Sequence, residues 1–212
     1  AEIGDDDPLP FVGSARDFSV EIAARTITDA LDYGIFKRLT MRSIDEARAH
    51  LIRAFEASGG LVVLNSMVAN NTYRKLDINE FRGFTLHSLV APLVFINGAD
   101  TKRGQVFSLL HEFAHVWCGE SGVSAGGEPL VDRDNDTERW CDAVAAEIAV
   151  PEDDLRGAFD DRADITDELD RLGDRYRCST LVVLIRLRDL SIVPREAFSD
   201  LYRAEVERLL AL

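Results

Sequence analysis

The chain has 212 residues, of which 46% are hydrophobic and 29% are charged, and this composition indicates one sizeable globular domain rather than a disordered chain. The formal net charge of −14 and the isoelectric point near 4.7 exclude a general nucleic-acid-binding protein, because phosphate contacts need clustered lysine and arginine. We therefore expect no direct contact with nucleic acid.

The cysteines and the apolar runs indicate the compartment. Cys118, Cys141 and Cys178 are odd in number and show no CxxC spacing, which is typical of free thiols in a reducing compartment. The sequence does not open with a basic segment followed by an apolar one, and no apolar run approaches the length of a membrane span. We expect a cytoplasmic protein that makes no contact with membranes.

The N-terminal half predicts helices followed by strands. Residues 1–16 are acidic and rich in proline and glycine, which is typical of a linker or a loosely packed lead-in. Helices are predicted over residues 17–33 and 43–57, and Ser43 can cap the second. Three short runs rich in β-branched and aromatic residues then predict a small antiparallel sheet: LVVLNSMV (61–68), FRGFTLHS (81–88) and PLVFIN (92–97).

The second half is predicted to be mainly helical. A helix is expected over about residues 101–118, then a Gly-rich, acidic loop over 119–136, then a helix that ends before Pro151. The sequence therefore predicts an α+β fold, with a core over residues 17–151 and a helical subdomain over residues 152–212.

The motif HEFAH lies on the helix expected over residues 101–118. Its two histidines, His111 and His115, are four residues apart and so lie on one face of the helix, where both imidazoles can bind one metal ion. Glu112 between them can act as the general base beside that ion. The motif predicts a catalytic zinc site with one Zn²⁺ per chain.

A catalytic zinc normally takes a third protein ligand. A metzincin would have a histidine six residues after His115, but that position is Ser121, so this class is excluded. Glu138, which opens the next helix, is the candidate third ligand. Asp142, one turn further along, can accept a hydrogen bond from the free ring nitrogen of His111. This spacing resembles the gluzincin peptidases.

A closer resemblance includes the neighbouring residues. FRGFTLHSLVAPLVFINGADTKRGQVFSLLHEFAHVWCG (81–119) followed by ERWCDAVAAEIAVP (138–151) resembles the ImmA/IrrE family of zinc metallopeptidases. The resemblance implies a zincin-like fold, zinc binding by His111, His115 and Glu138, and catalysis by Glu112. The chain departs from the family pattern in two places, since Asp142 replaces the usual asparagine and Val150 the usual methionine.

Several further residues are candidates with a simpler structural interpretation. His87 and Tyr73 flank the predicted sheet, and either one could stabilise the oxyanion of a tetrahedral intermediate. Cys118 and Cys141 lie near the motif, but we expect them to be small buried hydrophobic side chains rather than zinc ligands. Residues 166–193 have a helix–turn–helix rhythm, but five acids offset five arginines there, so packing or partner docking is favoured over DNA binding.

The resemblance also implies a role. It predicts a peptidase that makes limited cleavages in a transcriptional repressor of the XRE helix–turn–helix type, or an antitoxin-type partner, in stress response or in phage or mobile-element control. We further hypothesise that the strand ending at Asn97 pairs with an extended substrate. Two alternatives stay open: a catalytically silent module that holds zinc and docks such a repressor, and a structural zinc site with four protein ligands.

Overall fold

The structure is a computed structural model that describes residues 7–68, 71–78, 80–125 and 136–211. The helices are α1 (Val20–Ala30), α2 (Ile35–Thr40), α3 (Ile44–Ala57), α4 (Lys102–Cys118), α5 (Asp136–Ala149), α6 (Glu152–Ala158), α7 (Ile165–Tyr176), α8 (Thr180–Asp189) and α9 (Arg195–Leu210). The strands are β1 (Leu61–Asn65), β2 (Met67–Val68), β3 (Asn71–Lys75), β4 (Phe81–Leu86), β5 (Leu93–Asn97) and β6 (Gly122–Ala125). This arrangement confirms the predicted α+β fold class.

The main sheet has four strands in the order β1-β5-β4-β6, and β2 and β3 form a separate two-stranded ribbon. The predicted antiparallel pairing holds for β4 with β5 and for β4 with β6, whereas β1 runs parallel to β5. The chain reverses direction after β4, and β5 then lies between β4 and β1, antiparallel to β4 and parallel to β1. Because β5 then has a hydrogen-bonded neighbour on each side, the hypothesis that an extended substrate pairs with it is wrong.

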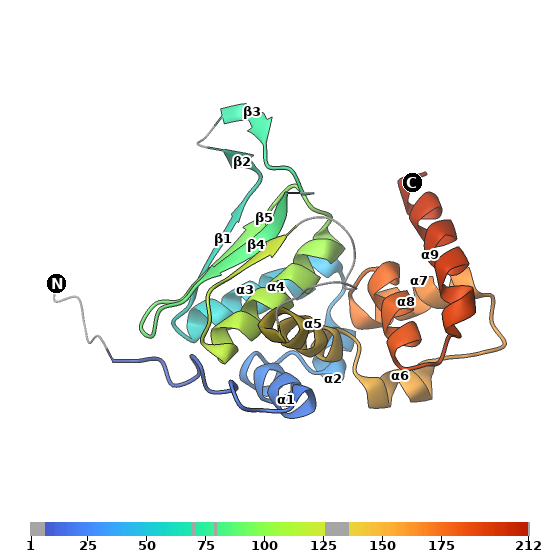
Figure 1. The fold of residues 1–212 in the computed structure, drawn as a ribbon, viewed down its shortest axis with the longest axis horizontal. Helices are drawn as coiled ribbons and strands as arrows, with labels where there is room; N and C mark the ends of the chain where they lie inside the picture. The colour runs from blue at the N-terminus through green and yellow to red at the C-terminus, as the bar shows by residue number, and fades with distance from the viewer. Residues whose placement is uncertain (1–6, 69–70, 79, 126–135, 212) are drawn as a thin grey trace.

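The helices α3 and α4 pack against one face of this sheet, as Figure 1 shows. Val94 and Ile96 of β5 and Thr85 of β4 point toward this side and are fully buried. Neighbouring positions such as Phe84 and Phe95, whose rings stack at 4.9 Å, alternate to the opposite face. The sheet therefore acts as a wall on one side of α4.

The helix α4 is central to the molecule. The side chain of Thr101 accepts a hydrogen bond from the N–H of Gly104 and caps its start, and Gly119 ends it in the left-handed conformation at φ 78°. The helix contacts α1, α3, α5 and the sheet, so nearly all of its side chains are buried. A helix enclosed in this way has no face toward solvent, so the polar side chains of its HEFAH motif lie in the interior.

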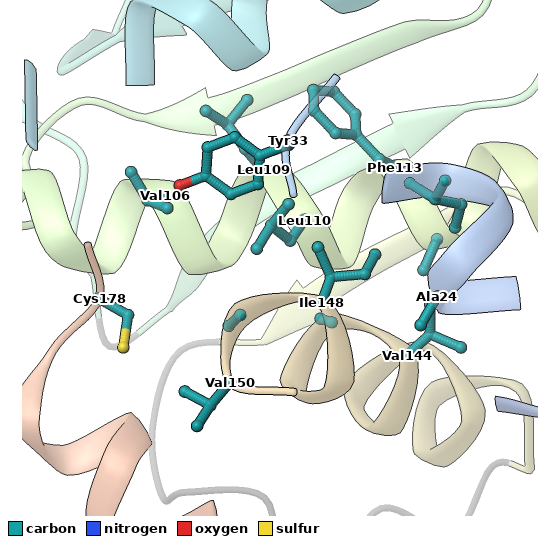
Figure 2. Close-up of a cluster of buried hydrophobic side chains, with 14 of the residues drawn as sticks. Ala24, Tyr33, Val106, Leu109, Leu110, Phe113, Val144, Ile148, Val150 and Cys178 are labelled. Atoms are coloured by element: carbon teal, nitrogen blue, oxygen red, sulfur yellow. The ribbon is translucent and has the colours of Figure 1, made fainter. Parts of the chain in front are cut away.

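The core joins α4 to the helices below it. Figure 2 shows this contact, where Ala24 of α1 and Leu110 of α4 lie beside Val144 and Ile148 of α5. All four side chains are at least 97% buried. This apolar packing fixes the distance between α4 and α5, the two helices that carry the candidate metal ligands.

The N-terminal lead-in is better packed than expected. Within its described part, residues 7–16, the N–H groups of Gly13 and Ala15 donate to the carbonyls of Val116 and Trp117 at 3.0 and 2.9 Å. These carbonyls belong to the last turn of α4, where the N–H of the cap residue Gly119 reaches those of His115 and Val116 but not that of Trp117. The expected loose packing is therefore corrected for these residues, because they complete the end of the central helix.

The C-terminal helices α6 to α9 follow α5, and the predicted helical character of this region is confirmed. Arg177 in the left-handed conformation ends α7, and α8 begins three residues later, which gives the predicted helix–turn–helix rhythm. Val183, Leu184 and Leu187 of α8 are fully buried. The helix α8 is therefore a packing helix of this group, in contact with α7 and α9. None of the helices in the described ranges is long and apolar enough to cross a membrane.

Candidate metal centre

The two motif histidines face each other inside the protein. His111 and His115 are 2% and 1% exposed, and their Nε2 atoms lie 3.1 Å apart. Two neutral imidazoles cannot both offer a lone pair into so short a gap without a positive charge between them. The gap therefore suits a proton or a metal ion.

Glu138 of α5 completes the group as the sequence predicts. Its carboxylate oxygens lie 3.4 Å from Nε2 of His111 and 3.1 Å from Nε2 of His115. Ligands of a tetrahedral zinc ion, with bonds of about 2.0–2.1 Å, are separated by roughly 3.3 Å. The donor set and its spacing therefore fit such an ion, and His111, His115 and Glu138 form a metal-binding group of the described residues.

The ring of His115 has its polar contacts on one side. Its Nδ1 is buried and has no hydrogen-bond partner among the residues that the structure describes. Gly122 lies against the ring so closely that a Cβ there would be 2.4 Å from it. Because this strand position leaves no room for a larger residue, β6 holds the imidazole toward His111 and Glu138.

Asp142 orients the other ring. Its Oδ1 lies 2.8 Å from Nδ1 of His111, one α5 turn beyond Glu138. A carboxylate there keeps the hydrogen on Nδ1 and leaves Nε2 to face the gap. The predicted second contact of His111 is thus present in the structure.

The site attracts positive charge. Burial opposes the charged form of His111, but hydrogen bonds to Asp142 and Glu138 outweigh it and raise its pKa to about 9. Burial likewise raises the pKa of Glu138, but the hydrogen bonds from both histidines outweigh this effect and hold it far below its usual range. Without a metal ion, a proton therefore takes the place of the cation.

Glu112 lies on the sheet side of α4 and is fully buried. Its Oε2 accepts a hydrogen bond of 2.8 Å from Oγ1 of Thr85 on β4. The sequence interpretation missed Thr85, because its partner is 27 positions away and nothing local marks the pair. A buried carboxylate next to two metal ligands can accept and return a proton.

The two candidate oxyanion stabilisers stay predictions. His87 is exposed beyond the end of β4, and its backbone N–H donates to Oγ of Ser121 at 2.9 Å. Tyr73 belongs to β3, and its side chain lies outside the described part of the structure.

The cysteines are free thiols in the interior. Cys118, Cys141 and Cys178 form no disulfide with one another, and each is less than 9% exposed. Burial raises the pKa of all three thiols, and that of Cys178 rises to about 12. Since a metal ligand must be a thiolate, this supports the prediction that Cys118 and Cys141 are small buried hydrophobic side chains.

Comparison with known families agrees with this geometry. The family model for the IrrE N-terminal-like domain of peptidase M78 matches residues 56–188, which include the sheet, both ligand helices and most of α8. The curated proteins compared with the chain give no match. The matched region covers more than half of the chain and all three residues of the metal-binding group. The chain therefore belongs to the peptidase M78 family of metallopeptidases, the ImmA/IrrE family that its motifs resemble.

Proposed function

We propose that this protein is a zinc-dependent endopeptidase. The observation that carries the proposal is the convergence of His111, His115 and Glu138 on one buried point, with Glu112 on the adjoining position of α4. The three ligand atoms lie within 4.8 Å of one another and include no cysteine. Two imidazoles with one carboxylate are the ligands of catalytic zinc sites, which leave one position open, rather than of closed structural ones.

The chemistry divides between the metal and the chain. A zinc ion held by these three side chains would supply Lewis acidity toward water and toward a peptide carbonyl. Glu112 takes a proton from the attacking water and returns it to the leaving amine. Asp142 keeps His111 in the tautomer that offers Nε2, and Thr85 donates to the carboxylate of Glu112. These contacts hold the reacting groups in fixed directions before a substrate arrives.

The substrate we propose is a protein that is cut at few sites, namely a helix–turn–helix repressor of the XRE type or an antitoxin-type partner. Support comes from membership of the M78 family and from the motif resemblance. We propose that the protein acts on this partner directly, in the cytoplasm, and not through nucleic acid. In α8, Arg186 pairs with Glu147 and Arg188 lies over the ring of Phe198, so these arginines already have partners within the chain.

The decisive experiment combines metal content with cleavage. Purified wild type, Glu112→Gln and the exposed control Glu56→Gln are each analysed for bound zinc and incubated with a helix–turn–helix regulator encoded beside this protein. We expect one zinc per chain in all three and cleavage by the wild type and Glu56→Gln alone. Removal of a general base should lower the rate by about 10²–10⁴-fold.

Other outcomes decide between the alternatives. Zinc binding without cleavage of the regulator or of a broad peptide library would favour the docking module that holds zinc without turnover. A regulator that is cut equally by Glu112→Gln would remove Glu112 from the mechanism. A protein that binds no divalent ion would contradict the proposed function as a whole.

A further inference from the structure

The strand β4 forms a small cradle for the carboxylate of Glu112. Gly83 and Thr85 are two positions apart on this strand, so they lie on the same face of the sheet. That face is turned toward α4, and both residues are buried. Each of them meets one oxygen of the carboxylate.

Thr85 contacts Glu112 twice. Its Oγ1 lies 2.8 Å from Oε2 and 3.1 Å from the backbone carbonyl oxygen of the same residue. A threonine hydroxyl has one hydrogen to donate, and the ionised carboxylate is the stronger acceptor. The hydroxyl of Thr85 thus lies within hydrogen-bond distance of both the side chain and the backbone of Glu112.

Gly83 leaves space for the other carboxylate oxygen of Glu112, Oε1. A Cβ built on this glycine would lie 2.9 Å from Oε1 of Glu112 and 2.8 Å from the backbone oxygen of Phe95. The backbone oxygen belongs to the β4–β5 pairing and cannot move aside. Any larger residue at this position would therefore push against the carboxylate. The absence of a side chain is what leaves room for the carboxylate beside the strand.

We infer that Thr85 is a positioning residue for the catalytic base Glu112, with Gly83 providing the space that the positioned carboxylate occupies. The inference rests on the proposed function, since it assigns Thr85 a role through Glu112. A glutamate side chain has several rotamers, and a base that samples them spends little time in the reactive direction. Displacement of a reacting group by about 1 Å can lower a rate by about 10²-fold.

The chain supplies a matched control for Thr85. Thr180 is also buried and also pairs with a buried glutamate, Glu205, but it lies on α8 among the C-terminal helices. Thr85→Val and Thr180→Val therefore remove the same kind of hydroxyl contact from two places. Thr85→Ser keeps the hydroxyl and tests whether that group alone restores kcat.

The test measures kcat and KM for the regulator, zinc affinity and thermal unfolding in each variant. We expect Thr85→Val to lower kcat by about 10–100-fold, with KM and zinc affinity within about threefold of wild type. Thr85→Ser should recover most of kcat, and Thr180→Val should keep it at the wild-type value. Unchanged kcat in Thr85→Val, no recovery in Thr85→Ser, or a loss confined to KM or zinc affinity would overturn the inference.

A second readout does not depend on turnover. Crystal structures of the zinc-loaded wild type and of Thr85→Val would show directly where the carboxylate of Glu112 lies. We expect it over Gly83 in the wild type and rotated away, or spread over several positions, in the variant. The same single position in both would overturn the inference even if the enzyme proves inactive. Failure of the wild type to cleave any substrate would instead contradict the proposed function and leave this structural comparison to decide the role of Thr85.

Discussion

Two of the regions that bury charged side chains differ in what those side chains face. One is the metal centre between α4 and α5. The other is the junction at the far end of α5, where arginines connect the core to the C-terminal helices. Figure 1 places the junction between α2, α5 and α7. Both regions use the same helix α5, so the difference between them lies in the contacts rather than in the scaffold.

At the junction, the terminal nitrogens of a buried guanidinium face backbone carbonyls, although Nε of Arg38 has no hydrogen-bond partner among the described residues. Arg38 of α2 is fully buried, and its Nη1 donates to the carbonyl of Ala149 at 2.6 Å and lies 3.3 Å from that of Tyr176. Its Nη2 donates to the carbonyl of Ile148 at 3.0 Å. These carbonyls end α5 and α7, where the helix dipole is negative. The guanidinium of Arg38 thus connects α2 to the C-terminal ends of α5 and α7.

At the metal centre, acceptors meet acceptors. The Nε2 atoms of His111 and His115 and the carboxylate of Glu138 all point at one space. Such an arrangement costs free energy unless a cation joins it. The comparison teaches that a buried cation whose terminal donors face acceptors of the chain indicates structure, whereas converging acceptors indicate a ligand from outside the chain.

The largest expected effect separates the two regions by metal addition. Zinc at a free concentration 1,000 times its dissociation constant should raise the free energy of unfolding of the wild type by about 4 kcal/mol, since the ion binds the folded site only. His115→Ala, which removes one of three ligands, should lose nearly all of this gain. Urea denaturation with and without zinc measures it, and the exposed His87→Ala is the control. A gain that survives in His115→Ala would place the zinc elsewhere.

A somewhat smaller effect is expected at the junction, and it should not depend on metal. Arg38→Met keeps much of the side-chain volume but leaves the carbonyls of Ile148 and Ala149 without their donor. The free energy of unfolding should fall by about 3 kcal/mol. The same denaturation measured with Arg53→Met, an exposed arginine of α3, should change by less than about 0.5 kcal/mol. A loss of stability seen only in the presence of zinc would break the comparison.

The sequence was informative where the signals are local. His111, Glu112 and His115 follow from their spacing on one helix, and Glu138 and Asp142 from their spacing on the next, because ligand geometry on a helix depends on the chain nearby. The Thr101 cap and the Gly119 stop likewise mark the ends of α4 within a few residues. Most of the candidate metal site could be predicted for this reason.

What could not be predicted depends on pairing across long distances. The segment GVSA of β6 shows no strand pattern and becomes a strand because β4 offers it an edge. The direction of β1 beside β5 depends on how the chain returns between them. Arg38 binds a carbonyl 111 positions away, and as one polar residue on a short helix it gave no signal of burial.

The pH dependence of the metal-free protein sharpens the comparison further. The pKa of His111 is raised from 6.5 to about 9 in the folded protein, so its proton stabilises the fold fully below pH 6.5. This stabilisation is lost as pH rises through about 9. Between pH 6.5 and 9.5 the free energy of unfolding should fall by about 3 kcal/mol more in the wild type than in His111→Gln. Urea denaturation in the presence of a chelator measures the difference.

Zinc binding should depend on pH in the opposite direction to the stability of the metal-free protein. Zinc must displace the proton of His111, so the affinity for zinc should rise with pH over the same interval. Equal pH dependence with and without the metal would mean that proton and ion do not compete for one space. That outcome would contradict the interpretation of the converging acceptors.

The smallest expected effect tests what Asp142 contributes to His111. Asp142→Ala removes the acceptor for Nδ1 and should weaken zinc binding by about 10–100-fold, as measured by competition with a chelator of known affinity. Asp142→Asn keeps an acceptor oxygen and loses only the charge, so its loss should lie near tenfold or below. Since asparagine is the usual residue at this position in the family that the motifs resemble, a small loss would mean that orientation of the ring is what the position supplies. A loss in Asp142→Asn as large as in Asp142→Ala would show instead that the negative charge of Asp142, rather than its hydrogen bond to His111, is what strengthens zinc binding.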